Sequence, residues 1–156
     1  MNNSTPTPRP LHDRPETAKA GGPAQEGPPV AILIVEDHPV VRAALRDWLS
    51  VVFPDCACLE AVSGEDAVQL AVAQTPAIVL MDIGMGPMNG IEATRRIKAA
   101  APQTEVVMLS IHEANSYQNA ALAAGASAYV TKRMMHADLL PVMRRLLTGP
   151  ARETTA

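Results

Sequence analysis

Four short apolar segments of the sequence each end on side chains that could do chemistry. These segments are residues 30–35 before Glu36 and Asp37, residues 77–81 before Asp82, residues 106–109 before Ser110, and residues 128–130 before Thr131 and Lys132. Ligands of a parallel sheet bind in the crevice beyond the carboxyl ends of its strands. If the four segments are neighbouring parallel strands, three carboxylates, a hydroxyl and an ammonium group meet at one edge.

This set of groups favours one kind of chemistry. Carboxylates of like charge repel one another unless a cation lies between them, and a set of oxygen ligands suits Mg²⁺. A carboxylate can also act as a nucleophile and carry a covalent intermediate. The pattern therefore predicts a site that holds a divalent metal and a phosphoryl group, with Asp82 placed to accept that group.

The elements that position these residues alternate along the chain. Apolar, strand-like runs begin near residues 30, 57, 77, 105 and 127, and a helical stretch follows each one. The runs are continuously apolar rather than alternating, which fits a parallel sheet covered by helices on both faces. Five such units predict an α/β fold with a doubly wound five-stranded parallel sheet.

Residue types at helix ends predict where the helices start and stop. The expected helices span residues 39–53, a stretch opened by Ser63 with Asp66 three residues later, residues 89–100, residues 113–124, and a last helix ending at Gly149. Pro39 suits a first helical position, and Gly125 suits a helix end. Pro141 falls within the last helix. We therefore expect that helix to begin near Ala137 or Asp138, where first-turn N–H groups lack a partner anyway.

Composition sets broad limits. The chain has 156 residues and a net charge of -3, which suggest one domain with no overall attraction to nucleic acid or anionic membranes. It contains no apolar run of the ~20 residues that a membrane helix needs and no targeting segment, so we expect a cytoplasmic protein. Cys56 and Cys58 are interpreted as buried thiols in a reduced compartment. His112 and His136 lack metal-ligand spacing.

The two ends of the chain differ from the rest. Residues 1–29 hold seven of the fourteen prolines and no aromatic residue. Such a segment cannot bury enough apolar surface to offset its ordering entropy, so we predict a disordered N-terminal tail there. Residues 149–156 are predicted to form a short disordered C-terminal tail.

Three stretches carry a resemblance to a known family. They are residues 35–42 (Val-Glu-Asp-His-Pro-Val-Val-Arg), residues 81–83 with Gly-Ile-Glu-Ala-Thr at 90–94, and residues 123–132 (Ala-Ala-Gly-Ala-Ser-Ala-Tyr-Val-Thr-Lys). Over residues 30–148 the chain resembles response-regulator receiver domains of two-component systems, which have a flavodoxin-like (βα)5 fold. It is most similar to receivers of the subfamily with a helix-turn-helix output domain (LuxR-type).

The resemblance implies a role for each site residue. Asp82 would accept a phosphoryl group from a sensor histidine kinase or a histidine phosphotransfer protein. Asp37 and Asp82 would bind Mg²⁺, with Glu36 acting through water and Gly84 through its carbonyl. Lys132 would pair with the phosphoryl oxygens. Ser110 would donate a hydrogen bond to them, and Tyr129 would turn inward as an aromatic switch when Ser110 moves.

The resemblance also implies a mode of signalling. Beyond slow self-catalysed phosphotransfer and autodephosphorylation, no enzyme activity is expected. Output would pass to a downstream protein partner or a phosphorylation-dependent homodimer. Nucleic-acid or membrane binding is not expected of this chain.

Several alternatives stay open at this point. Asp82 could be a helix-capping aspartate, Glu36-Asp37 could cap a helix before Pro39, and Tyr129 could be a packing residue. The chain could be a transcriptional regulator whose DNA-binding domain is absent, because few residues follow Thr148. It could also be a stand-alone phosphate sink or adaptor. A phosphatase with Asp82 as its nucleophile would want an acid two residues on, where Gly84 stands.

The sequence departs from the family pattern in two places. The turn after the acceptor reads Met85-Gly86-Pro87-Met88-Asn89-Gly90, with glycine and proline exchanged relative to the usual order. Arg133 follows Lys132, where many receivers have proline after a cis peptide bond. Because a cis bond without proline costs about 3–4 kcal/mol, we expect a trans or strained bond here.

Overall fold

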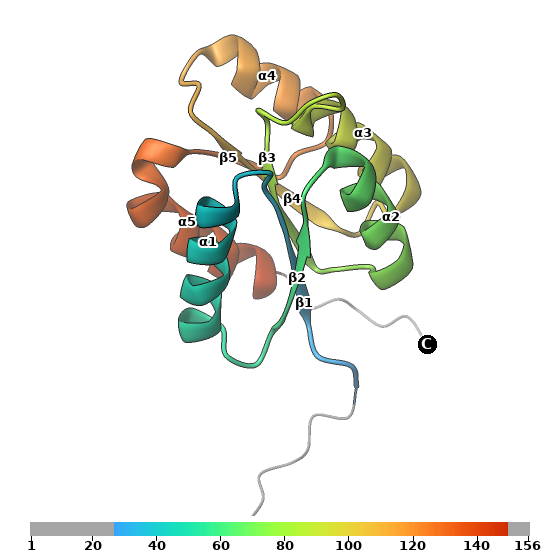
Figure 1. Cartoon of the computed structure of the whole chain (residues 1–156), viewed down its shortest axis with the longest axis vertical. Helices are drawn as coiled ribbons and strands as arrows, with labels where there is room; N and C mark the ends of the chain where they lie inside the picture. Colours follow the sequence, from blue (N-terminus) through green and yellow to red (C-terminus); the bar gives the residue numbers. More distant parts are fainter. Residues whose placement is uncertain (1–26, 150–156) are drawn as a thin grey trace, which may run out of the picture.

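The computed structural model describes residues 27–149, drawn in colour in Figure 1. The predicted tails at residues 1–29 and 149–156 lie almost entirely outside the described residues. The elements run in the order β1 (Ala31–Val35), α1 (Pro39–Val52), β2 (Ala57–Ala61), α2 (Gly64–Gln74), β3 (Ile78–Asp82), α3 (Gly90–Ala100), β4 (Glu105–Ser110), α4 (Asn115–Ala123), β5 (Ala128–Thr131), a 3₁₀ turn (Lys132–Met134) and α5 (Met135–Leu147).

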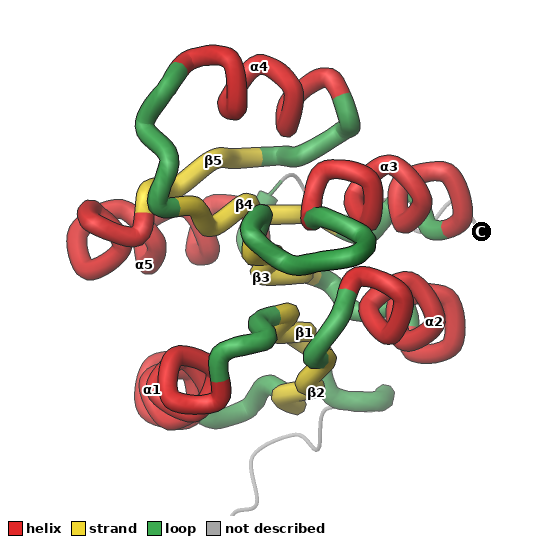
Figure 2. Tube along the Cα trace, turned by 45° about the horizontal axis from the view of Figure 1, so that its top comes forward, coloured by secondary structure: helices red, strands yellow, loops and turns green. Residues whose placement is uncertain are grey.

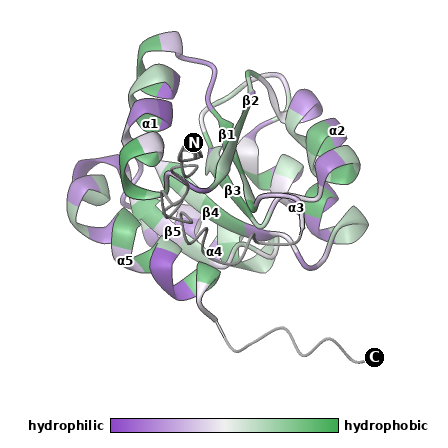
Figure 3. Cartoon of the chain, turned by 90° about the horizontal axis from the view of Figure 1, so that it is seen from below, coloured by the Kyte–Doolittle hydropathy of each residue, from purple (hydrophilic) through white to green (hydrophobic). Residues whose placement is uncertain are grey.

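The five strands form one parallel sheet in the order β2-β1-β3-β4-β5. Helices α1 and α5 cover one face, and α2, α3 and α4 cover the other (Figure 2). Figure 3 shows hydrophobic strands between helices that alternate hydrophobic and hydrophilic residues. The predicted doubly wound five-stranded parallel sheet is therefore confirmed.

Each face of the sheet has its own apolar core. Leu45 and Leu49 of α1 and Leu139 and Met143 of α5 are buried against one face. On the other face the helices contribute mostly small residues, because α2 and α3 pack closely there; these are Ala67, Ala71, Ala93, Ile97 and Ala121. The sheet order reverses direction between β1 and β3, and this switch point is where ligands bind in such folds.

Most predicted helix ends agree with the structure. Ser63 caps α2, and its hydroxyl accepts a hydrogen bond from the Asp66 N–H at 3.1 Å. The helix α4 is shorter than predicted at its start, since it begins at Asn115 rather than 113. It ends before Gly125, whose φ of +104° is the left-handed conformation that favours glycine.

Two predictions about individual segments are wrong. The helix α5 begins at Met135, not near Ala137, so Pro141 lies in its interior. The helix accommodates Pro141 there because Leu139 and Met143, on either side of it, are fully buried and hold α5 against the sheet. Cys58 is exposed and Cys56 only half-buried. Cys58 lies in β2 and Cys56 directly precedes it, and β2 is an edge strand that the helices cover incompletely.

Within residues 27–149, no helix combines the length and the apolar character needed to cross a membrane.

Candidate functional site

The proposed acceptor, Asp82, ends a strand in the middle of the sheet. Strand β3 is buried along its whole length and pairs with β1 on one side and β4 on the other. The residue is 7% exposed, and its Oδ1 accepts a hydrogen bond from the Gly84 N–H at 3.2 Å. Asp82 does not cap α3, because the cap is Asn89, so the helix-capping alternative is wrong.

Gly90 explains how the chain turns so tightly behind the acceptor. Its N–H donates to the Ile83 carbonyl at 3.1 Å. A Cβ atom at Gly90 would lie 2.2 Å from the carbonyl oxygen of Asp82, which is far inside any tolerated contact. Only glycine lets α3 start this close to the strand, so Gly90 positions the acceptor from behind.

Two further carboxylates come from the end of β1. Carboxylate oxygens of Glu36, Asp37 and Asp82 all lie within 4.8 Å of one another. Glu36 is 2% exposed, whereas Asp37 is exposed. The N-cap of α1 is His38, and its side chain makes no capping bond. The alternative that the acidic pair merely caps α1 is therefore wrong.

Lys132 reaches this cluster from the end of β5. Its Nζ lies 2.8 Å from Glu36 Oε2 and 3.4 Å from Asp82 Oδ1. Burial alone would lower the pKa of Lys132, but the hydrogen bond to Glu36 and the charge of Asp82 outweigh burial and raise it. Burial raises the pKa of Glu36, with a contribution from the charge of Asp82, despite the opposing effect of Lys132.

These residues line one pocket of about 220 Å³. Its walls are Glu36, Asp37, Asp82, Gly84, Ser110, Ile111, His112 and Lys132. The three carboxylates, when ionised, outnumber the single ammonium group and leave two negative charges uncompensated, which matches a divalent cation. The donor set is oxygen only, as Mg²⁺ prefers. The structure thus brings six predicted site residues together in a pocket that fits Mg²⁺.

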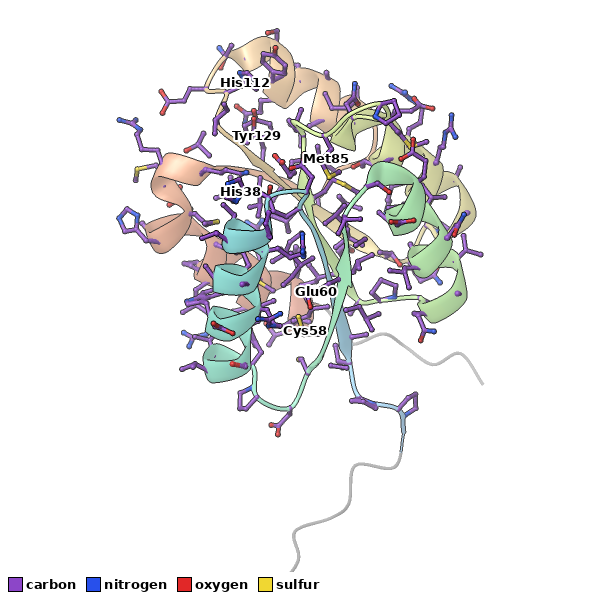
Figure 4. The ribbon with its side chains drawn as sticks, viewed as in Figure 1. His38, Cys58, Glu60, Met85, His112 and Tyr129 are labelled. Atoms are coloured by element: carbon purple, nitrogen blue, oxygen red, sulfur yellow. The ribbon has the colours of Figure 1, made fainter. Side chains whose placement is uncertain are left out.

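The seventh predicted residue, Tyr129, connects to the pocket indirectly. Ser110 is buried, and its Oγ accepts a hydrogen bond from the His112 N–H at 3.0 Å. The half-buried Tyr129 donates its hydroxyl to the His112 carbonyl at 2.6 Å. Figure 4 shows His112 and Tyr129 near each other beside α4. The predicted pair Ser110 and Tyr129 is therefore linked through the main chain of one residue.

Sequence reasoning missed the contact that the His112 side chain makes. Its ring is stacked on Tyr117 of α4, with 4.2 Å between ring centroids and 10° between planes. The only sequence signal was the pair of aromatic rings five residues apart, across a loop of unknown shape.

The two departures from the family pattern have definite conformations. The Lys132–Arg133 peptide is trans, as expected for a bond without proline, and Arg133 Nε pairs with Glu113 at 2.7 Å. The Gly86–Pro87 peptide is cis. Met85, just before it, is buried in the core, so the exchanged turn still packs against the domain.

Comparison with known proteins gives a consistent result. A family model described as the response regulator receiver domain matches residues 32–144. The chain is 35% identical over 122 residues to the transcriptional activator protein ExaE of Pseudomonas putida, covering 78% of this chain and 57% of that protein. It is 32% identical over 120 residues to the response regulator UvrY of Escherichia coli (strain K12), covering 77% and 55%.

Solved structures resemble the fold closely. A LuxR-family two-component response regulator from Aurantimonas sp. SI85-9A1 superposes with a TM-score of 0.72 at 33% identity, covering 78% of this chain and 87% of that chain. The response regulator domain of Thermotoga maritima CheB gives 0.68 at 29% identity, covering 79% and 100%. The chain spans little more than half the length of the curated relatives it matches.

Proposed function

Because the chain belongs to the response regulator receiver family, we propose that Asp82 accepts a phosphoryl group from a phosphohistidine in a Mg²⁺-dependent reaction. The observation that carries this proposal is the meeting of Asp82, Lys132 and the Glu36-Asp37 pair in one pocket. Each comes from the carboxyl end of a different element, and buried like charges are costly unless they serve a ligand.

The nucleophile would be one particular oxygen of Asp82. Within residues 27–149, the hydrogen bond from Gly84 and the ion pair with Lys132 both go to Oδ1. An electron pair on Oδ2 would form the new O–P bond while the P–N bond of the donor breaks, and the donor imidazole would keep that electron pair. The product is an acyl phosphate on Asp82.

Two side chains of the protein and a bound Mg²⁺ would hold the transferred phosphoryl group. Lys132 offers a positive charge at the acceptor. The Ser110 hydroxyl, whose oxygen accepts the His112 N–H in this structure, would turn to donate its proton to a phosphoryl oxygen. A bound Mg²⁺, held by Asp37 and Asp82, by the Gly84 carbonyl and through water by Glu36, would neutralise charge on the phosphoryl oxygens.

The acceptor assignment is tested with a small phosphodonor. Acetyl phosphate and Mg²⁺ should add one phosphate to the parent, detected by intact-protein mass, and Asp82→Asn should add none. Asp138→Asn, an exposed carboxylate on α5, is the matched control and should label like the parent. Undiminished labelling of Asp82→Asn would show that another residue is the acceptor.

The phosphoryl group would shift an equilibrium between two conformations and so signal to a partner. We propose a downstream protein or a second copy of the chain as that partner, and a cytoplasmic location, where a kinase and its phosphodonor are available. The support is the link from Ser110 through His112 to Tyr129.

A second candidate is the receiver part of a transcriptional regulator. It is favoured by the relative ExaE, which is named as a transcriptional activator, and by the part of that protein's length that the chain covers. Sequencing the gene and its transcript distinguishes the two, because a DNA-binding segment in the same reading frame would favour the regulator.

A further inference from the structure

Three elements meet at the main chain and ring of one residue, His112, in the loop between β4 and α4. Its N–H donates to Ser110 Oγ at the pocket, and its carbonyl accepts from Tyr129 Oη on β5. Its ring is stacked on Tyr117 in the first turn of α4. We call these three contacts the His112 junction.

The helix at the far side of the junction is weakly held by anything else. Among its own residues, α4 buries only Ala121. Its N-cap, Ala114, has no side chain that can accept a hydrogen bond from the first turn, and that turn has no acidic residue. Arg133 pairs with Glu113 just outside the helix, but both side chains are exposed. The stacked ring of Tyr117 is thus a principal anchor of the start of α4.

Ring stacking also fixes where the His112 side chain points. The ring packs flat on Tyr117, with 4.2 Å between the ring centroids, so it lies toward α4. This arrangement disfavours a role for the imidazole as a base that orients water at the acceptor. It favours a positioning role, because the stacked ring and the two hydrogen-bonded main-chain groups belong to one residue.

We propose that His112 is a positioning residue that couples the phosphoryl pocket to α4 through its stack on Tyr117. The inference rests on the function proposed for Asp82 and adds the route by which α4 responds. When the Ser110 hydroxyl turns to a phosphoryl oxygen, the His112 N–H bonded to it is displaced. The ring follows the main chain, the contact with Tyr117 changes, and the first turn of α4 is released or rearranged.

The coupling has a reciprocal consequence. If the phosphoryl group changes the stability of α4, then loosening α4 must change the affinity of the pocket for a phosphoryl mimic by the same factor. The interaction free energy of an aromatic stack corresponds to a change of about two- to tenfold in an equilibrium constant at room temperature. The residue that tests this is Tyr117, which lies outside the pocket and is 38% exposed, so its replacement leaves the pocket walls intact.

The experiment compares the parent with Tyr117→Ala, Tyr117→Phe and His112→Ala. Hydrogen exchange is followed in α4 peptides of each protein with and without beryllofluoride and Mg²⁺, and the beryllofluoride affinity is measured by titration. The parent should show a mimic-dependent change of exchange in α4. Tyr117→Ala and His112→Ala should lose that change, and Tyr117→Ala should bind the mimic with an affinity about two- to tenfold different. Tyr117→Phe keeps the ring and should behave as the parent.

The outcomes separate this inference from the proposed function. An α4 response and a mimic affinity in Tyr117→Ala equal to those of the parent would overturn the coupling through the stack. So would loss of the response in Tyr117→Phe, because that variant keeps the stacked ring. A parent that takes up neither phosphate nor beryllofluoride would overturn the proposed function, and the coupling with it. If His112→Ala fails to fold, Tyr117→Ala alone decides.

Discussion

Helices α3 and α4 pack on the same face of the sheet, yet they are anchored to it very differently. Four residues of α3 are buried: Gly90, Ala93, Thr94 and Ile97. Thr94 also donates its hydroxyl to the Gly90 carbonyl at 2.7 Å. In α4 the only buried residue is Ala121, and Leu122 is 46% exposed. The helix after the acceptor strand is therefore built into the core, and the helix after the Ser110 strand mostly is not.

The first turns of the two helices differ in the same direction. Asn89 caps α3, with its side-chain oxygen accepting the Glu92 N–H at 2.9 Å, and Glu92 pairs with Arg95 and Arg96. Ala114 provides no such cap for α4. Regions with few buried contacts open at low free-energy cost. We infer that α3 is rigid and holds Asp82 in place, whereas α4 can change its conformation at a low free-energy cost.

The largest expected effect is on the free energy of unfolding, and it compares a core residue of α3 with an apolar residue of α4. Ile97→Ala removes a fully buried side chain and should lower the free energy of unfolding by about 2–5 kcal/mol. Leu122→Ala should change it by no more than about 0.5 kcal/mol, because Leu122 is largely exposed. Urea denaturation of both variants measures this. Similar losses in the two would mean that α4 is held as firmly as α3.

The next effect concerns Gly90, whose backbone lies close to the carbonyl group of the acceptor, Asp82. Gly90→Ala would place a Cβ atom against the Asp82 carbonyl, so we expect a loss of about 1–3 kcal/mol and slower phosphorylation by acetyl phosphate. Gly86→Ala is the control, because a Cβ at Gly86 has no atom within 4 Å. A parent-like phosphorylation rate in Gly90→Ala would show that α3 does not position the acceptor.

Much of this architecture could be predicted from the sequence because of one geometric rule. Parallel strands present their carboxyl ends at one edge, so Asp82, Ser110 and Lys132 had to approach one another once five βα units were recognised. Helix caps such as Ser63 depend on a few neighbouring residues and were also predictable. The acidic cluster was found for the same reason, since Glu36 directly follows a buried strand.

Features that depend on how elements cover one another could not be predicted. The exposure of Cys58 follows from the edge position of β2, which no local pattern reports. Pro141 was expected in a first turn, but burial on both sides holds it inside α5. The stack of His112 on Tyr117 depends on the path of a short loop. In each case the tertiary arrangement, and not a local preference, decides the outcome.

A smaller effect sharpens the contrast between the two first turns. Asn89→Ala removes the cap of α3 and should cost about 0.5–2 kcal/mol in denaturation experiments. Ala114→Asn adds a cap to α4, whose N-cap backbone is already extended at φ -66° and ψ 135°. It should slow hydrogen exchange in α4 while leaving α3 unchanged. Unaltered exchange in Ala114→Asn would mean that the start of α4 is limited by another contact.

The smallest effect is a pH dependence of stability that comes from Glu92 in the first turn of α3. The hydrogen bond from Arg96 lowers the pKa of Glu92 below its ordinary 4.5, with a further contribution from Arg95. A lowered pKa means that the folded state binds fewer protons than the unfolded state. The stabilisation from Glu92 is therefore fully present above pH 4.5 and is lost as the pH falls through the lowered value. Both partners are exposed, so screening keeps the effect small.

Thermal unfolding of the metal-free parent and of Glu92→Gln between pH 3 and pH 7 tests this sign. The parent should be the more stable above 4.5, and the difference should vanish at the acidic end. Glu36→Gln provides the opposite case, because burial raises the pKa of Glu36. The folded state then binds more protons than the unfolded state in the window just above 4.5, so the parent loses stability relative to Glu36→Gln as the pH rises through it. The difference in stability between parent and variant should therefore change with pH in opposite directions for Glu92→Gln and Glu36→Gln. The same pH dependence in both variants would mean that the surface carboxylate of α3 and the pocket carboxylate share one environment. The ion pairs of Glu92 would then contribute nothing to the rigidity of the first turn of α3.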